Sequence, residues 1–317
     1  MLSYLVFSVT LASLYAITAL GLNTQWGYTG MLNIGVAAFY SIGAYATAIV
    51  TGPASESHFG GFGLAFPAGL AVAIVLSGAI AFLIGLVTLN LRSDYLAIAT
   101  IGIAEIIRLV FTNEDWLTNG VRGIAGIPRP LAGLWEGHDQ LVYMLLVVAI
   151  LIAVYWLIER GYNSPWGRVL RAIREDEPAT ASAGKNVLVF RLQAFVLGSM
   201  AMGLAGALYA HFVGFVSPEA FRPDLATFLI WVMLIAGGSG NNRGAILGAF
   251  VIWAVWSGTE ILTGLLPQEY VTQGGALRVL LIGVLLQVIL LTRPQGLLPE
   301  RPPKSPVAST REGRRKA

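Results

Sequence analysis

Long apolar runs separated by short polar segments dominate this chain. Runs long enough to consider as membrane spans lie at 2–22, 31–50, 64–89, 95–112, 139–158, 188–213, 225–240, 245–264 and 277–292. About 20 apolar residues, rising about 1.5 Å each, cross the ~30 Å hydrocarbon core of a bilayer. A backbone surrounded by lipid must satisfy its own hydrogen bonds, which favours helices over open sheets. The pattern predicts an all-α integral membrane protein, a polytopic helix bundle of about nine (8–10) transmembrane segments.

Two of these runs contain glycine and polar residues that predict broken helices. One is the run at 31–50, and the other is the short run at 225–240, which leads into "GGSGNNRG". Irregular backbone at membrane depth survives only where protein or a water-filled cavity satisfies it. Broken helices can offer amide groups and helix ends to a substrate, although small residues can also serve close helix packing. Candidate pathway residues around the breaks are Asn23, Gly30, Asn33, Gly237, Gly238 and Gly240.

Close packing is the interpretation that we favour for Gly203, Gly206 and Ala207, which lie within the run at 188–213. His211, near the outer end of the same run, is interpreted as a polar residue with satisfied hydrogen bonds.

The composition supports lipid surroundings. Of 317 residues, 56% are hydrophobic and 12% are charged, about half the charged fraction of a typical soluble protein. The chain has no cysteine, which excludes disulfides and thiolate-bound metals, and its three scattered histidines argue against a histidine metal site. A net charge of +3 is too small to indicate nucleic acid binding. The first run has no basic residue before it, so we interpret it as a span rather than a cleavable signal.

The basic residues predict the sidedness of the loops. Six Lys and Arg residues lie from Arg160 to Arg191, and seven lie from Arg293 to Lys316, so both segments are expected in the cytoplasm. Arg92 fits a third cytoplasmic turn. The segments 51–63 and 113–138 then fall outside, and the N-terminus is external if two full spans precede residue 51. The segment 294–317 is basic and proline-rich, which predicts a disordered cytoplasmic tail.

The stretch "SPWGRVLRAIREDEPATASAGKNV", at 164–187, gathers unusually many charges. Ser164 and Pro165 are a helix-start signal, a side-chain cap followed by proline in the first turn. Apolar and basic residues then alternate at helical spacing until acidic residues and a proline end the run. The pattern predicts a short amphipathic helix with Trp166, Val169, Leu170 and Ile173 on one face and Arg168, Arg171 and Arg174 on the other.

Two surroundings are consistent with this helix. It could lie on lipid headgroups with its arginines toward anionic lipid. It could also dock on another protein, which we favour because Glu175, Asp176 and Glu177 would be repelled by an anionic surface.

Glu105 and Arg108 are the charged pair within the run at 95–112, three residues apart on one helix face. A charge at the bilayer centre costs roughly 2.5–3.5 kcal/mol, and less when a paired partner faces the bundle interior. The pair is a candidate lining of a transport route. The alternatives are a structural ion pair, or an arginine that extends to the outer interface.

The 164–187 stretch resembles the cytoplasmic coupling loop in permease subunits of branched-chain amino acid ABC importers. Those subunits read "S-x-x-G-R-x-x-x-A-I-R-E-[ND]-E-x-A-A…G-x-[ND]". Four further segments resemble family motifs in the family's order: "GLNTQWGYTGMLNIGVAAFYSIGAYATA" (21–48), "LRSDYLAIATIGIAEIIRLV" (91–110), "LTNGVRGIAGIPRP" (117–130) and "GGSGNNRGAILGA" (237–249). The resemblance covers residues 2 to about 300 and is to the LivM-like type.

The resemblance implies a transmembrane permease domain at 1–293, with a coupling loop at 161–187, in the bacterial inner membrane. Its expected partners are a second homologous permease subunit, two ABC ATPase subunits and a periplasmic substrate-binding protein. The expected substrate is leucine, isoleucine or valine; relatives that move urea, short amides or other amino acids leave that choice open. Coupling to the ATPases is expected at Arg168, Arg171, Ile173, Arg174, Glu175, Asp176 and Glu177.

No G-x-x-x-x-G-K-[ST] phosphate-binding loop occurs in the sequence, and no nucleophile–base set stands out. The chain is therefore predicted to be a transporter subunit and not an enzyme, with no cofactor or metal of its own and with ATP on the partner ATPases. An ion-driven carrier with Glu105 as the proton carrier is the main alternative. A membrane enzyme or a scaffold is disfavoured by the missing catalytic set.

Overall fold

Nine long helices build the part of the protein that the computed structural model describes, which is residues 2–55, 57–91, 93–133, 135, 137–263 and 271–300. They are α1 (Leu2–Thr29), α2 (Val36–Thr51), α3 (Phe66–Thr88), α4 (Ser93–Asn113), α6 (Asp139–Asn163), α9 (Val187–Val213), α10 (Pro223–Gly237), α11 (Asn242–Thr263) and α12 (Val271–Thr292). Each apolar run of the sequence lies largely within one of them, and the predicted all-α polytopic bundle is confirmed. The predictions for Arg92 and for 301–317 lie outside the described residues.

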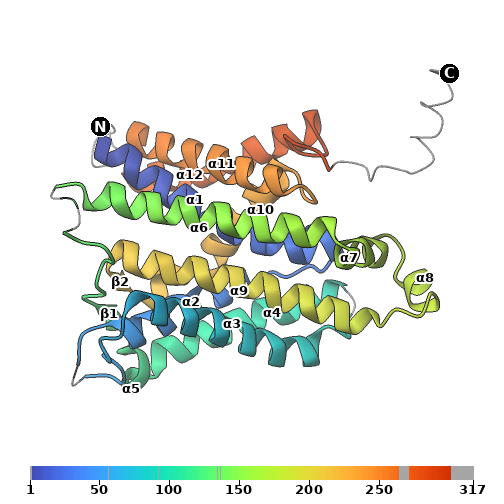
Figure 1. Ribbon diagram of the computed structural model, residues 1–317. Helices are drawn as coiled ribbons and strands as arrows, with labels where there is room; N and C mark the ends of the chain where they lie inside the picture. The colour runs from blue at the N-terminus through green and yellow to red at the C-terminus, as the bar shows by residue number, and fades with distance from the viewer. Residues whose placement is uncertain are drawn as a thin grey trace.

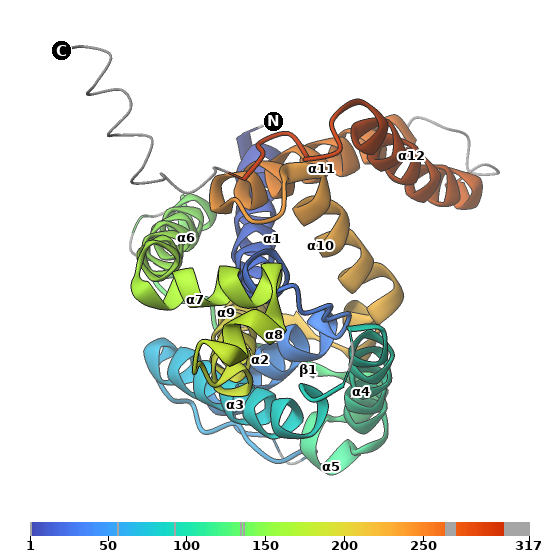
Figure 2. The same ribbon diagram turned by 90° about the vertical axis from the view of Figure 1, so that its right-hand side faces the viewer.

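Most of the long helices run side by side (Figure 1), whereas α10 lies obliquely to them (Figure 2). The short helices α7 (Pro165–Glu175) and α8 (Glu177–Ser182) lie at the right-hand end of this view. The opposite end carries α5 (Asp115–Thr118), β1 (Ile124–Ala125) and β2 (Phe215–Val216), with the 3-10 helices η1 (Gly120–Arg122) and η2 (Pro218–Phe221) in the same loops. Segments expected on opposite sides of the membrane thus lie at opposite ends of the bundle.

Six helical segments in the described part of the chain are both long and apolar enough to cross a membrane: α1, α3, α4, α6, α9 and Pro218–Gly237. Helix α2 and the apolar part of α12, Leu277–Thr292, are shorter. With 16 residues, α2 is about 24 Å long, less than the ~30 Å hydrocarbon core. The missing length lies in the irregular segment 30–35 before it.

Helix α1 continues through polar residues that the sequence analysis left outside its first span. It ends at Thr29 because Gly30 turns left-handed, with φ of 71°. The Gly30 N–H donates to the Trp26 carbonyl at 2.8 Å and the Met31 N–H donates to the Gln25 carbonyl at 3.2 Å. The first of these is the 5→1 bond of an αL closure, which favours glycine at the turning position. The predicted break is present, at residues 30–35.

Helices α1, α2 and α9 form the centre of the bundle, and α3, α4, α6 and α12 lie around it (Figure 2). Leu14, Ile17 and Leu20 of α1 are fully buried, whereas α3, α4 and α6 expose many large apolar side chains. Such exposure suits helices that face lipid.

Small residues bring the central helices into close contact. A Cβ atom on Gly206 would overlap the Tyr40 carbonyl oxygen, and one on Gly43 would overlap the Gly203 backbone. Ala207 is fully buried. The packing interpretation of Gly203, Gly206 and Ala207 is confirmed.

The outer loop layer contains a short antiparallel ladder that the sequence did not predict, pairing Ile124 with Val216 and Ala125 with Phe215. His211 supports this layer: its ring nitrogens lie 2.9 Å from the Thr47 hydroxyl and 2.7 Å from the Pro128 carbonyl oxygen. It is therefore the satisfied polar residue that was expected.

Replacing Gly206 by alanine should destabilise the bundle, because the new methyl group meets a backbone carbonyl that cannot move aside. We expect a loss of about 1–3 kcal/mol, seen as a lower Tm of the detergent-solubilised protein. The matched control is Gly102→Ala in α4, where a Cβ has nothing within 4 Å. That change should preserve or slightly raise Tm, since alanine favours helix. Equal Tm values for the two variants would contradict this packing account.

Candidate functional site

The predicted amphipathic helix is α7, and its apolar face packs against the end of the bundle. Gly167, Leu170 and Ile173 are buried. Trp166 is half-buried and donates from its indole nitrogen to the Gln193 side-chain oxygen at 2.9 Å. The sequence predicted that the Ser164 side chain caps α7, and this prediction is wrong. The Ser164 hydroxyl instead donates to the Gly161 carbonyl at 2.6 Å and closes α6.

A second short helix, α8, follows α7 directly and makes a hairpin with it. Asp176 joins the two helices, because its carboxylate accepts the Ala179 N–H at 2.9 Å and caps α8. A groove of about 630 Å³ lies along this hairpin, lined by Pro165, Arg168, Val169, Ala172, Glu175, Asp176, Ala179, Thr180, Ala183 and Lys185. The hairpin therefore presents both charge and a concave surface beyond the ends of the spanning helices.

The predicted coupling residues divide into an outward set and an inward set. Arg168 and Asp176 are exposed, Glu175 exposes 72% of its side chain, and Glu177 exposes 51% and lies 3.4 Å from Arg191. The inward set is Arg171, Ile173 and Arg174. The Arg171 guanidinium lies 4.2 Å from the centre of the Tyr162 ring, and Arg174 reaches the bundle itself.

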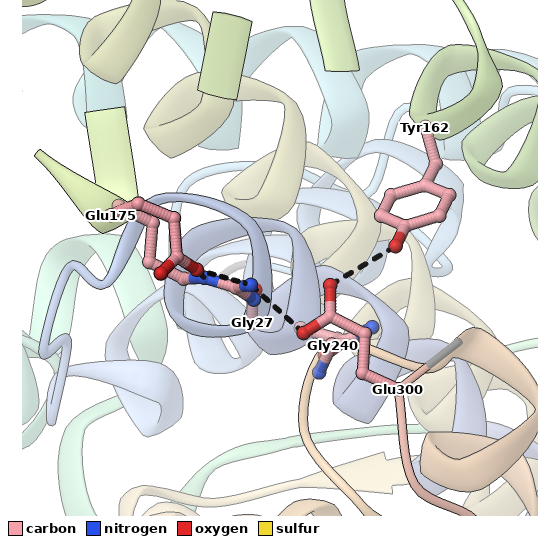
Figure 3. Close-up of polar contacts among 7 residues, drawn as sticks. Gly27, Tyr162, Glu175, Gly240 and Glu300 are labelled. Atoms are coloured by element: carbon pink, nitrogen blue, oxygen red, sulfur yellow. Dashed lines mark hydrogen bonds and ion pairs between the residues drawn. The ribbon is translucent and has the colours of Figure 1, made fainter. Parts of the chain in front are cut away.

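Arg174 connects the hairpin to two other segments, through Gly27 and Glu300, which are labelled in Figure 3. One nitrogen donates to the Gly27 carbonyl near the end of α1, and the other donates to the carboxylates of Glu300 at 2.8 Å and Glu175 at 2.9 Å. Partial burial disfavours the charge of Arg174, but the hydrogen bonds with Glu300 and Glu175 outweigh it and raise its pKa. The guanidinium therefore stays charged at any physiological pH.

A buried polar network lies behind this contact. The Asn23 amide nitrogen donates to Asn242 at 3.0 Å, and its oxygen accepts the Gly240 N–H at 2.8 Å. Tyr28 donates to the same Asn242 oxygen at 2.5 Å, and Asn242 donates to Glu159 at 2.7 Å. The network joins α1, α6 and the α10–α11 turn.

Asn33 organises the break between α1 and α2. Its side-chain oxygen accepts the Gly35 N–H at 2.7 Å, and its amide nitrogen donates to Gln25 at 2.7 Å. Its carbonyl accepts the indole N–H of Trp231 at 3.0 Å. These bonds satisfy irregular backbone where lipid could not.

A cavity of about 790 Å³ lies on the side of the bundle where α4 and α10 face one another (Figure 2). Its lining combines apolar and charged residues from four segments: Ile34, Ile101, Glu105, Arg108, Glu219, Arg222, Thr227, Phe228 and Trp231. Of the predicted pathway residues, Glu105 and Arg108 line it, and Asn33 borders it through Trp231. Asn23, Gly30, Gly237, Gly238 and Gly240 lie instead near the α7 end of the bundle.

Alternating charges follow one wall of this cavity. The Arg108 guanidinium lies 2.5 Å from Glu105 and 3.7 Å from Glu219, and Arg222 lies 4.0 Å from Glu219. Arg108 exposes only 20% of its side chain, against 42% for Glu105 and 70% for Glu219. Glu105 lies about 12 Å before the end of α4, so these charges extend into the membrane-spanning region.

The sequence analysis missed Glu219 and Arg222. Both lie in "SPEAFRP", a short connection between two apolar runs, where two charges flanked by prolines were the available signal. Nothing local indicated that this connection folds against α4.

The two regions together offer binding surfaces rather than reactive groups. The cavity presents both signs of charge beside apolar walls, which suits a small zwitterion with an apolar side chain. In the described residues no group of three or more His, Asp or Glu side chains is placed to hold a metal ion.

Comparison with known proteins agrees with this arrangement. Residues 4–290 match the family described as "Branched-chain amino acid transport system / permease component". The chain is 33% identical, over 93% of its length and 70% of the relative's, to the high-affinity branched-chain amino acid transport system permease protein LivM of Escherichia coli. It is 30% identical to a probable LivM of Methanocaldococcus jannaschii, over 91% of each chain.

A second type of permease is also similar. The high-affinity branched-chain amino acid transport system permease protein LivH of E. coli is 27% identical, over 92% of each chain. No solved structure matches the chain. The match over nearly the whole chain, with the break, the hairpin and the cavity in one bundle, shows that this protein belongs to the permease components of branched-chain amino acid transport systems.

Proposed function

We propose that this chain is one permease subunit of an ATP-binding-cassette importer that moves leucine, isoleucine or valine into the cytoplasm across the bacterial inner membrane. The observation that carries the proposal is the α7–α8 hairpin, which exposes charge at one end of the bundle while Arg174 ties it to the end of α1. The sequence has no phosphate-binding loop of its own, so the ATPases are two separate subunits.

The hairpin is the surface on which an ATPase docks in this proposal. Its outward residues Arg168, Glu175, Asp176 and Glu177 offer both signs of charge beside the groove. Closure of the two ATPases around ATP would displace the hairpin, and Arg174 would carry that displacement to the end of α1. The pathway would then change between outward and inward access.

The substrate pathway runs, in this proposal, along the cavity between α4 and α10, with a second homologous permease as its opposite wall. Glu105 is 42% exposed within a spanning helix, and a carboxylate facing lipid there would cost several kcal/mol. Covering protein or water removes that cost. A periplasmic substrate-binding protein would deliver substrate at the outer loops, next to Glu219 and Arg222.

The cavity chemistry supports a branched-chain amino acid. Arg108 and Arg222 can attract the α-carboxylate, and Glu105 and Glu219 can attract the ammonium group. Ile34, Ile101, Phe228 and Trp231 supply apolar surface for a branched side chain.

Replacing the outward charges of the hairpin should uncouple transport from ATP. In the triple variant Arg168→Ala, Glu175→Ala and Glu177→Ala, we expect co-purification of the ATPase and uptake of labelled leucine to fall at least ~10-fold, about 1.4 kcal/mol of association energy. All three side chains are exposed, so Tm should be unchanged. Glu114→Ala, at the opposite end of the bundle, is the control and should retain the ATPase. Normal leucine uptake by the triple variant would contradict a role of the hairpin in coupling.

Single and double variants of the Glu105–Arg108 pair distinguish a role in the substrate pathway from a structural role. Arg108→Gln leaves Glu105 without its closest cation and should lower stability by about 1–3 kcal/mol, measured as Tm. The double variant Glu105→Gln and Arg108→Gln should recover most of that stability, because no unpaired charge remains. Leucine uptake by the double variant should remain at least ~10-fold below that of the wild type, since the charges proposed to bind the substrate are gone. Recovery of both Tm and uptake would mean that the pair is structural only.

A further inference from the structure

The segment that follows α12 docks back onto the bundle, although the sequence predicted that a disordered tail begins at 294. The Leu297 N–H donates to the Ala236 carbonyl, and the Leu298 N–H donates to the Gly237 carbonyl, both at 2.9 Å. The Asn241 side chain donates to the Leu298 and Pro299 carbonyls at 3.4 and 3.0 Å. Residues 297–299 are therefore held by backbone contacts to the C-terminal end of α10 and to the α10–α11 turn.

Glu300 lies at the end of this docked segment and points toward the coupling hairpin (Figure 3). Its carboxylate accepts the Tyr162 hydroxyl of α6 at 3.1 Å and the Arg174 guanidinium of α7 at 2.8 Å. Its side chain is only 26% exposed, whereas Glu175, the other carboxylate on Arg174, is 72% exposed. Glu300 is thus the more sheltered partner of the arginine that enters the bundle.

The Arg174–Glu300 pair touches both the end of α1 and the α10–α11 turn. Arg174 bonds the Gly27 carbonyl and packs beside Gly30, where α1 ends. A Cβ on Gly240 would lie 2.8 Å from the Glu300 carboxylate, so the α10–α11 turn abuts the pair directly. Gly30 and Gly240 both have left-handed backbone, with φ of 71° and 83°. Glycine at such positions lets the chain pivot with little steric resistance.

A mechanical consequence follows from this geometry. Arg174 of the hairpin bonds the end of α1 directly and lies beside Gly240, and Glu300 links it to the segment that is hydrogen-bonded to the α10–α11 turn. Charge-assisted hydrogen bonds in a sheltered site are short and directional, so the three parts can move as one body. Without the carboxylate, the hairpin would keep its contact with α1 but lose its charged link to the turn.

We propose that Glu300 is a positioning residue for transport, which locks the coupling hairpin to the α10–α11 turn so that motion of the hairpin also moves that turn. This inference rests on the proposed function, because it assigns Glu300 a part in the coupling of ATP hydrolysis to uptake. It gives the docked segment 293–300 a role in transport.

The first experiment measures leucine molecules transported per ATP hydrolysed by the purified complex in liposomes. Glu300→Gln keeps the size of the side chain and removes its charge, and the backbone bonds of Leu297 and Leu298 hold the segment in place. We expect ATP hydrolysis within about twofold of wild type and a transported-per-hydrolysed ratio at least ~10-fold lower. Gln295→Ala, an exposed position in the same segment, is the control and should leave the ratio unchanged.

Rescue tests the charge itself. Glu300→Asp retains the carboxylate and should restore part of the transported-per-hydrolysed ratio. If Glu300 were only structural, the ratio would fall and recover together with Tm across these variants. An unchanged ratio in Glu300→Gln overturns the proposal, as does a ratio that falls only in proportion to folded protein.

The second experiment needs no ATPase, which separates this inference from the proposed function. The chain has no native cysteine, so spin labels at Ser182→Cys in α8 and Ser239→Cys in the turn report one distance. We expect a narrow distance distribution in the otherwise wild-type chain and a broadened one with Glu300→Gln. Identical distributions overturn the proposal. Broadening together with the absence of ATP-driven uptake by the wild-type complex would refute the proposed function instead.

Discussion

Lipid offers no hydrogen bonds, so each interruption of a helix in this bundle must find its partners within the protein. Among the described residues, two such places are the segment 30–35 and the α10–α11 turn. The amide side chains of Asn23, Asn33 and Asn242 satisfy the backbone and side-chain groups exposed there. The same bonds join helices that are far apart in sequence. Satisfying the breaks therefore also decides which helices are held together at this end of the bundle.

The coupling hairpin makes use of those satisfied breaks. Arg174 adds its guanidinium to the carbonyl of Gly27, a helix-end acceptor that lacks a regular partner. Glu300 then balances the charge of that guanidinium. A hairpin attached only by its apolar face could slide, whereas one attached at a helix end cannot move without moving that helix. Attachment to a helix end thus accounts for the one arginine of this charged stretch that enters the bundle.

The cavity differs from the helix ends, because its charged side chains are partly exposed and not all covered by this chain. Glu105, Glu219 and Arg222 alternate in sign with Arg108, which limits the net charge on the wall. An alternating wall attracts a zwitterion without trapping a simple ion. It also accounts for the need of a second permease subunit in the proposal, since only protein or water can cover such a wall.

Apolar length located every long helix, because about 20 apolar residues leave few other structures in a membrane. The amphipathic period likewise located α7, and glycine located the break at Gly30. The sequence could not extend α1 to Thr29, because Asn23 and Gln25 find partners in α11 and α9. It missed Glu219, Arg222 and Glu300 for a related reason: each acquires its importance from a contact with a distant segment, which no local pattern encodes.

The most direct test of the account is a gentle affinity purification of this chain from its native membrane, with identification of every protein that accompanies it. An importer energised through the hairpin should yield near-equal amounts of a second hydrophobic permease and of an ATPase that carries a phosphate-binding loop. If the chain instead purifies alone and still moves leucine when reconstituted without ATP, the hairpin is not a coupling element, and an ion-driven carrier replaces the importer.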